Sequence, residues 1–114
     1  MVYDQCSICS TLDGYHHASQ KGGRPDDDTS LPPSALQLTV VRDFAPGADR
    51  ELQLRQCPEC RTHYLYRTDY EFLVNGTENE QYLARLSEAD AIEYLTAPAA
   101  TCYRRSLDTT FNLR

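Results

Sequence analysis

Four of the five cysteines form two Cys-x-x-Cys pairs, the spacing that a tetrahedral metal site requires. The pairs are Cys6/Cys9 and Cys57/Cys60. Zinc takes short bonds to four thiolate or imidazole ligands, so two ligands have to come from each of two tight turns. The two intervening residues let the backbone curl until both sulfurs of a pair face the ion. We therefore expect these four thiolates to bind one structural Zn²⁺.

The second pair carries the clearer pattern. In Cys57-Pro58-Glu59-Cys60 the proline fixes the turn, and strand-like segments lie on either side, which resembles the zinc knuckle of the zinc-ribbon and rubredoxin-like class. That class usually has glycine after the second cysteine, where the backbone needs a positive φ. Arg61 stands there instead, so this knuckle has to tolerate strain or turn differently. The first pair has neither proline nor glycine, and the spacer of residues 10–56 is longer than is common in ribbons.

Other chemistries use the same thiols and stay open. A thioredoxin-like dithiol sits at a helix N-terminus after a buried strand, where its pKa is lowered. Cys57 instead lies between two strand patterns, which disfavours redox catalysis. An iron or iron–sulfur centre takes the same four thiolates, and the spacing alone does not separate iron from zinc. Cys102 has no ligand-like neighbour in sequence and is expected to be a small buried residue.

The remaining polar residues are weaker candidates for metal binding or catalysis. His16, His17 and His63 are expected at the surface or behind the ligands rather than bound to the metal. The run Asp26–Asp28 lacks the spaced oxygens and the glycine of a calcium loop, so we expect a solvated loop. No Ser/His/Asp set and no glycine-rich phosphate loop stands out. The chain is therefore expected not to be an enzyme.

The residues between the cysteine pairs have to bring the second pair back to the first. Asp13 to His17 reads as a turn, and residues 20–34, with Gly-Gly, an Asp triplet and Pro-Pro, predict a flexible loop. Alternating apolar residues then predict a β-hairpin. They are Leu36, Leu38, Val40 and Phe44 in the first strand and Leu52 and Leu54 in the second.

A third strand is expected over residues 62–72. One face of it is aromatic, with Tyr64, Tyr66, Tyr70 and Phe72. We expect these rings to pack against helices as part of the core; exposed rings would favour a protein interface. Base stacking needs interleaved basic side chains, and only Arg67 is on this strand.

Residues 77–114 are expected to be helical. Asn75-Gly76 is expected to end the sheet, and Thr77 to Glu80 fits a capping box. Ser87 offers a second N-cap, and Pro98 ends the helix that follows it. Tyr103, Leu107 and Phe111 recur every four residues, which suits a short last helix.

These patterns predict one α+β domain over residues 1–114. A small antiparallel sheet carries a zinc-ribbon-like knuckle at one end and packs against C-terminal helices. A chain of 114 residues with 40% hydrophobic content has a modest core. Metal binding that occurs only in the folded state adds directly to the free energy of folding.

The net charge and the composition limit the classes of partner and the cellular location that we expect. The net charge of −6 opposes binding to a phosphate backbone, so nucleic acid is not the expected partner. No apolar run is long enough to span a membrane, and the N-terminus lacks signal-peptide features, so we expect a cytosolic protein. Ten of the eleven basic residues are arginine, a skew associated with GC-rich bacterial genomes, so we expect a bacterial source. The leading hypothesis is a zinc protein that binds another protein, as an accessory subunit or immunity-type protein. A nucleic-acid-associated ribbon and a thiol redox protein are the alternatives.

Overall fold

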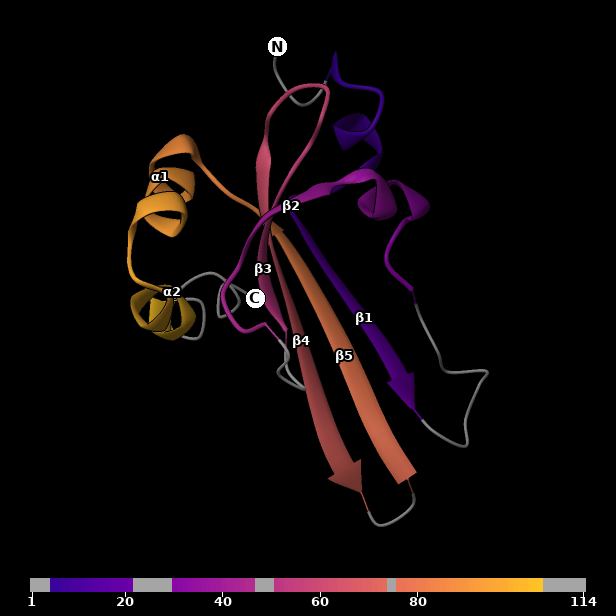
Figure 1. Cartoon of the computed structure of the whole chain (residues 1–114). Helices are drawn as coiled ribbons and strands as arrows, with labels where there is room; N and C mark the ends of the chain where they lie inside the picture. Colours follow the sequence, from indigo (N-terminus) through magenta and orange to yellow (C-terminus); the bar gives the residue numbers. More distant parts are fainter. Residues whose placement is uncertain (1–4, 22–29, 47–50, 74–75, 106–114) are drawn as a thin grey trace.

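The computed structural model describes residues 5–21, 30–46, 51–73 and 76–105. Within these ranges, the side chains of 20–21, 69–73, 76–79 and 103–105 lie outside the description. The described chain forms one five-stranded antiparallel sheet and two short helices (Figure 1). No helix among the described residues is long and apolar enough to cross a membrane.

The sheet has the strand order β1-β5-β4-β3-β2, so the first two strands of the sequence form its two edges. The strands are β1 (Tyr15–Lys21), β2 (Thr39–Asp43), β3 (Leu52–Gln56), β4 (His63–Leu73) and β5 (Gly76–Arg85). Helices α1 (Glu88–Thr96) and α2 (Ala99–Arg105) follow, and short 3-10 turns lie at Cys9–Thr11 and Pro33–Gln37.

The predicted helix after Thr77 is wrong, because this segment is strand β5. It pairs with β4 from Leu73↔Gly76 to Tyr64↔Arg85 and with β1 on its other side. Asn-Gly is a dipeptide favoured between paired strands, so Asn75-Gly76 signalled a hairpin rather than the end of the sheet. Both faces of β5 are covered near its end, where the consecutive residues 82–84 are all buried. That removes the alternation by which a strand is recognised.

The prediction of helices after Ser87 is confirmed where the structure describes the chain. The Ser87 side chain accepts a hydrogen bond from the Asp90 backbone N–H, so Ser87 is the predicted N-cap of α1. Helix α1 ends at Thr96, before Pro98. Helix α2 begins directly after that proline. The Tyr103 side chain and residues 106–114, with Leu107 and Phe111, lie outside the described residues.

The predicted hairpin exists as β2 and β3, but its first strand is shorter than expected. Leu52 and Leu54 are fully buried, as predicted. Leu36 is 85% exposed because the chain forms a 3-10 turn there instead of a strand. The pairing of β2 with β3 shifts between Val40 and Arg42, which breaks the alternation, so that Leu38 packs in the core on the cysteine side and Phe44 in the core under the helices. Val40 is exposed as well.

Two predicted loops are also shorter than expected. Strand β1 begins at Tyr15, so the turn expected at residues 13–17 ends earlier. The loop expected at residues 20–34 overlaps β1 at its start and the 3-10 turn from Pro33 at its end. Residues 22–29, including the Asp triplet, lie outside the described residues.

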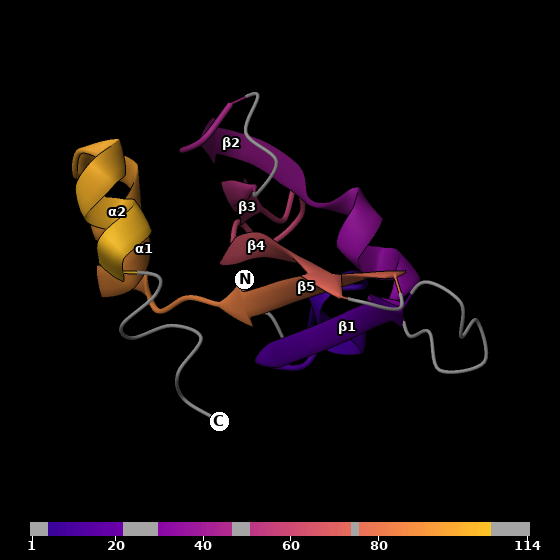
Figure 2. The same ribbon diagram turned by 90° about the horizontal axis from the view of Figure 1, so that it is seen from below.

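Both faces of the sheet are covered, by different parts of the chain. Helices α1 and α2 lie together on one side (Figure 2), where Leu65 and Tyr82 join a core with Ala91 and Tyr94. On the other side Tyr64 packs with the cysteines and the N-terminal segment. The expectation that the aromatic face of β4 packs against the C-terminal helices is therefore wrong for Tyr64 and Tyr66, which both belong to the core on the cysteine side. The Tyr70 and Phe72 side chains lie outside the described residues.

Replacing Leu65 with alanine should destabilise the fold strongly. Its side chain is fully buried on the helix side of the central strand. Loss of a buried leucine removes transfer free energy and leaves a cavity, so we expect about 2–5 kcal/mol less free energy of unfolding. Urea unfolding of the metal-loaded variant and wild type measures this difference in the free energy of unfolding. Leu36→Ala is the matched control and should change stability by less than about 0.5 kcal/mol; equal effects would contradict this placement of the core.

Candidate metal centre

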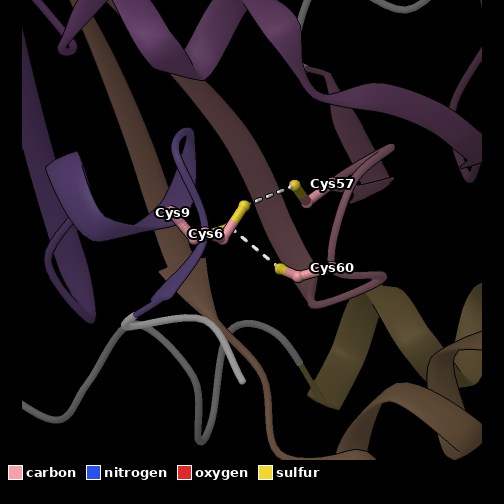
Figure 3. Close-up of side chains that lie close together, drawn as sticks. All are labelled: Cys6, Cys9, Cys57 and Cys60. Atoms are coloured by element: carbon pink, nitrogen blue, oxygen red, sulfur yellow. Dashed lines mark hydrogen bonds between the residues drawn. The ribbon is translucent and has the colours of Figure 1, made fainter. Parts of the chain in front are cut away.

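The two cysteine pairs meet on the side of the sheet away from the helices. Cys57 and Cys60 belong to the turn between β3 and β4, and Cys6 and Cys9 to the segment before β1 (Figure 3). The Sγ atoms of Cys6 and Cys57 are 3.5 Å apart, as are those of Cys9 and Cys60. All four sulfurs lie within 4.8 Å of one another. Residues 51 positions apart in sequence thus form one cluster.

The cluster fits a tetrahedral metal ion. Zn–S bonds of about 2.3 Å place the sulfurs of a regular tetrahedron about 3.8 Å apart, within the span of the separations found here. A disulfide needs about 2.05 Å between sulfurs, and all four cysteines are free thiols. Each is at most 8% exposed. Four buried soft ligands around one point are a donor set for zinc or iron.

Of the two alternatives left open for the second knuckle, the structure shows the strained one, with a left-handed backbone at Arg61. The Cys57 N–H donates to Thr62 O (2.9 Å), and the Arg61 N–H donates to Cys57 O (3.1 Å), which closes the turn. Arg61 has φ 68°, the one positive φ of a non-glycine residue in the described part of the chain. This is the position where ribbons usually carry glycine. The chain therefore keeps the knuckle conformation and accepts its strain.

The first knuckle closes without proline or glycine. The Ser10 N–H donates to Cys6 O, and the Leu12 N–H donates to Cys9 O, both at 3.0 Å. These bonds wrap the 3-10 turn around Cys9. Backbone hydrogen bonds thus close both knuckles, and only the second has a proline in its turn.

The metal-free thiols differ in acidity. Burial raises the pKa of Cys9. The backbone N–H of Cys9 favours the Cys6 thiolate, but burial and neighbouring thiols outweigh it and raise the pKa of Cys6. Burial also opposes ionisation of Cys60, yet hydrogen bonds from Thr62 and the other thiols lower the pKa of Cys60 to about 7. A metal must displace the protons held by Cys6 and Cys9, so binding tightens as pH rises.

One carboxylate lies beside the cluster. Glu59 Oε2 accepts from Ser7 Oγ (2.6 Å) and from the Cys6 thiol (3.6 Å). That second bond requires a proton on Cys6. Once metal binding removes the proton, the carboxylate faces a thiolate, and the like charges repel.

The other candidate residues lie away from the four sulfurs. Cys102 is buried in α2, as predicted, with its sulfur near the carbonyl oxygens of residues 93, 94 and 97. His16 Nε2 accepts from the Asp13 N–H (2.8 Å), and His17 lies 3.2 Å from Glu80. Burial lowers the pKa of half-buried His63. Within the described ranges, only the four cysteines form a group of three or more close metal-ligand side chains.

Two residues that touch the first knuckle were not identified from the sequence. The Arg85 guanidinium donates to Leu12 O (2.6 Å) and to Tyr64 Oη (3.3 Å). The helical region expected over residues 77–114 includes Arg85, and the core expected to face the helices includes Tyr64. The β4–β5 register places the two residues opposite each other, a non-local pairing that the local sequence patterns do not display.

The sequence matches no protein-family model, and no curated protein or solved structure matches it. The resemblance to zinc ribbons is carried by the two cysteine motifs.

Replacing Arg61 with glycine should stabilise the protein. A left-handed backbone costs a non-glycine residue about 1–2 kcal/mol, and the greater freedom of glycine in the unfolded chain offsets part of the gain. We expect a net increase of up to about 1 kcal/mol, measured by urea unfolding of the metal-loaded form. Arg61→Ala removes the same side chain but keeps the strain, so it should give no gain. Equal stabilisation by both would point to the arginine charge instead.

Replacing Glu59 with glutamine should tighten metal binding a few-fold. The change removes a negative charge next to Cys6 in the metal-bound state while keeping the size of the side chain. Competition with a chromophoric chelator at low ionic strength measures the affinity. Glu88→Gln, an exposed site on the opposite side of the sheet, is the control for net charge. An unchanged or weaker affinity in Glu59→Gln would show that the carboxylate does not oppose the thiolate.

Proposed function

We propose that this chain is a non-enzymatic zinc protein that works by binding another protein. In this proposal one Zn²⁺, bound by Cys6, Cys9, Cys57 and Cys60, holds the fold together. The observation that carries it is the convergence of four buried sulfurs within 4.8 Å from two distant turns.

A structural role for the metal is supported by the closed ligand set. Four protein thiolates fill a tetrahedral zinc shell and leave no position for water or substrate, unlike a catalytic site. The ion would join the segment before β1 to the β3–β4 turn. Since the site does not exist in the unfolded chain, its binding free energy becomes folding free energy.

Zinc is favoured over iron because nothing else in the sequence points to electron transfer. Zn²⁺ has no redox chemistry and is the usual metal of structural four-thiolate sites. Iron accepts the same donors. An iron centre would be coloured, so the absorption spectrum of the purified protein separates the two.

A thiol redox function is less well supported. The 3.5 Å contacts join cysteines of different pairs rather than the two cysteines of one motif. All four sulfurs are buried, whereas a redox-active cysteine needs access for an external thiol. The pKa of Cys60, near 7, is the one property that favours this alternative.

A protein partner is supported by apolar side chains at the surface. Val40 and Val41 are about half exposed on the edge strand β2, and Ile92 and Leu95 are exposed on α1. Such residues mark protein interfaces when they gather on an edge or a helix face. The net charge of −6 disfavours nucleic acid. An accessory subunit or immunity-type protein of a reducing bacterial cytosol fits this combination.

The Cys57→Ser variant tests the metal proposal. Protein purified without added metal should contain about one zinc per chain by elemental analysis. Cys57→Ser should lose both the zinc and the cooperative unfolding transition. Removing the Cys57 thiolate breaks the set of four ligands and leaves three thiols in a buried site. Cys102→Ser changes an equally buried cysteine outside the cluster and should keep the zinc.

Other results would contradict the proposal. Wild-type protein without metal that readily forms disulfides within each pair would favour the redox alternative. Tight binding of an oligonucleotide that weakens steeply with salt would favour the nucleic-acid alternative. The partner itself is sought by co-purification with the products of neighbouring genes.

A further inference from the structure

Both knuckles carry a threonine at the same place in their sequence. Thr11 stands two residues after Cys9, and Thr62 stands two residues after Cys60, so both motifs read Cys-x-x-Cys-x-Thr. Each threonine hydroxyl forms a hydrogen bond within its own knuckle. The partner of that bond is a backbone oxygen in the first knuckle and a sulfur in the second.

The Thr11 hydroxyl supports the turn of the first knuckle. Thr11 is the last residue of the 3-10 turn Cys9–Thr11, and its Oγ1 donates to Ile8 O, three residues back, at 2.7 Å. A bond to the preceding turn is common for threonine in helical backbone. Ser34 Oγ lies 2.6 Å from the same hydroxyl. The Thr11 hydroxyl therefore joins the first knuckle to the 3-10 turn that begins at Pro33.

The Thr62 hydroxyl contacts one of the four sulfurs. Its Oγ1 lies 3.1 Å from Cys60 Sγ. The preceding residue is Arg61, whose φ of 68° takes the backbone out of a helical path, and Thr62 leads directly into β4. A helical path, as at Thr11, would direct the hydroxyl to a carbonyl oxygen of the preceding turn. The left-handed residue that strains the second knuckle thus also brings the threonine to the sulfur.

Backbone hydrogen bonds fix Thr62 in this position. Thr62 O accepts from the Cys57 N–H at 2.9 Å, and Gln56 Nε2 donates to Arg61 O at 3.3 Å. Thr62 is half-buried and Cys60 is buried, so little water competes for the sulfur. In such surroundings a hydrogen bond is stronger than in bulk water.

Metal binding sets the direction of the bond between Thr62 and Cys60. Between a hydroxyl and a protonated thiol, either group can donate. A metal-bound thiolate has no proton, so the hydroxyl has to be the donor. Four thiolates around one Zn²⁺ carry a net negative charge, and burying that charge is unfavourable unless donors face it. A hydrogen bond to a charged acceptor is also stronger than one between neutral groups. The contact therefore stabilises the metal-bound state more than the metal-free state.

We infer that Thr62 is a positioning residue of the metal site, whose hydroxyl donates a hydrogen bond to the Cys60 thiolate. The bond lowers the energy of the sulfur lone pairs, keeps the Cys60 side chain directed at the ion and slows release of the metal. The inference rests on the proposed metal-binding function and adds to it a residue outside the four thiolates.

The test compares Thr62→Val with Thr11→Val in the full chain. Both changes replace a hydroxyl with a methyl group at the same position of matched motifs, but only Thr62→Val removes a hydrogen bond to a ligand sulfur. Thr62→Val should weaken zinc affinity about tenfold, as is typical for loss of a group that supports a metal ligand. It should also speed zinc transfer to a chromophoric chelator. Thr11→Val should have the smaller effect on both.

The spectrum of the Co²⁺-substituted protein separates this role from a role in stability alone. Thr62→Val should move the thiolate-to-cobalt charge-transfer band to lower energy, because the sulfur lone pairs lose a bond that lowers their energy. Thr62→Ser keeps the hydroxyl and should keep the wild-type band. Thr11→Val should also keep that band, even where it lowers the free energy of unfolding.

Three results would overturn the inference. They are an unmoved band in Thr62→Val, an equal shift in Thr11→Val, and a Thr62→Ser variant that behaves like Thr62→Val. If Thr62→Val takes up no cobalt, Thr62→Ala removes the hydroxyl without placing a methyl group against the sulfur and should show the same shift; an unmoved band there would overturn the inference too. Metal uptake by Thr62→Ser but by neither of these variants would support it, and failure of all three would overturn it. Wild-type protein that binds no metal would instead contradict the proposed function.

Discussion

The meeting of four buried thiols is the constraint on which the rest of this structure depends. The segment before β1 contributes a short 3-10 turn and no strand of its own. Yet the core on that side of the sheet includes the cysteines themselves together with Ile8, Leu12 and Leu38. A metal bound there joins parts of the chain 51 residues apart. Binding of a metal ion there would therefore be coupled to formation of that half of the core.

The central strand links the site to the helices. In β4 the neighbours Tyr64 and Leu65 point to opposite faces, as strand geometry requires. Tyr64 reaches the cysteines, and Leu65 packs in the core under α1. The same strand pairs with β5, which ends at Arg85 beside the first knuckle. The sheet thus positions both the ligands and the groups that support them, while the helices close its other face.

Local patterns made part of this fold predictable and non-local pairing decided the rest. The cysteine spacing, the strands around Leu54 and Tyr64, and the Ser87 cap act over a few residues, so the sequence displays them. The residues from Thr77 to Glu80 also match a local pattern, that of a helix start. Pairing with β4 and β1 on its two sides nevertheless makes this segment a strand. Alternation showed that Tyr64 is buried; it does not show which segment covers it. At Leu36 a proline-initiated 3-10 turn replaced the predicted strand.

The central claim is that four cysteine sulfurs share one zinc ion. X-ray absorption at the zinc edge, on protein purified without added metal, examines that ligand shell directly. The account predicts about one zinc per chain with four sulfur neighbours at about 2.3 Å. Absence of zinc, or a shell in which nitrogen or oxygen replaces one or more of the sulfurs, would contradict it.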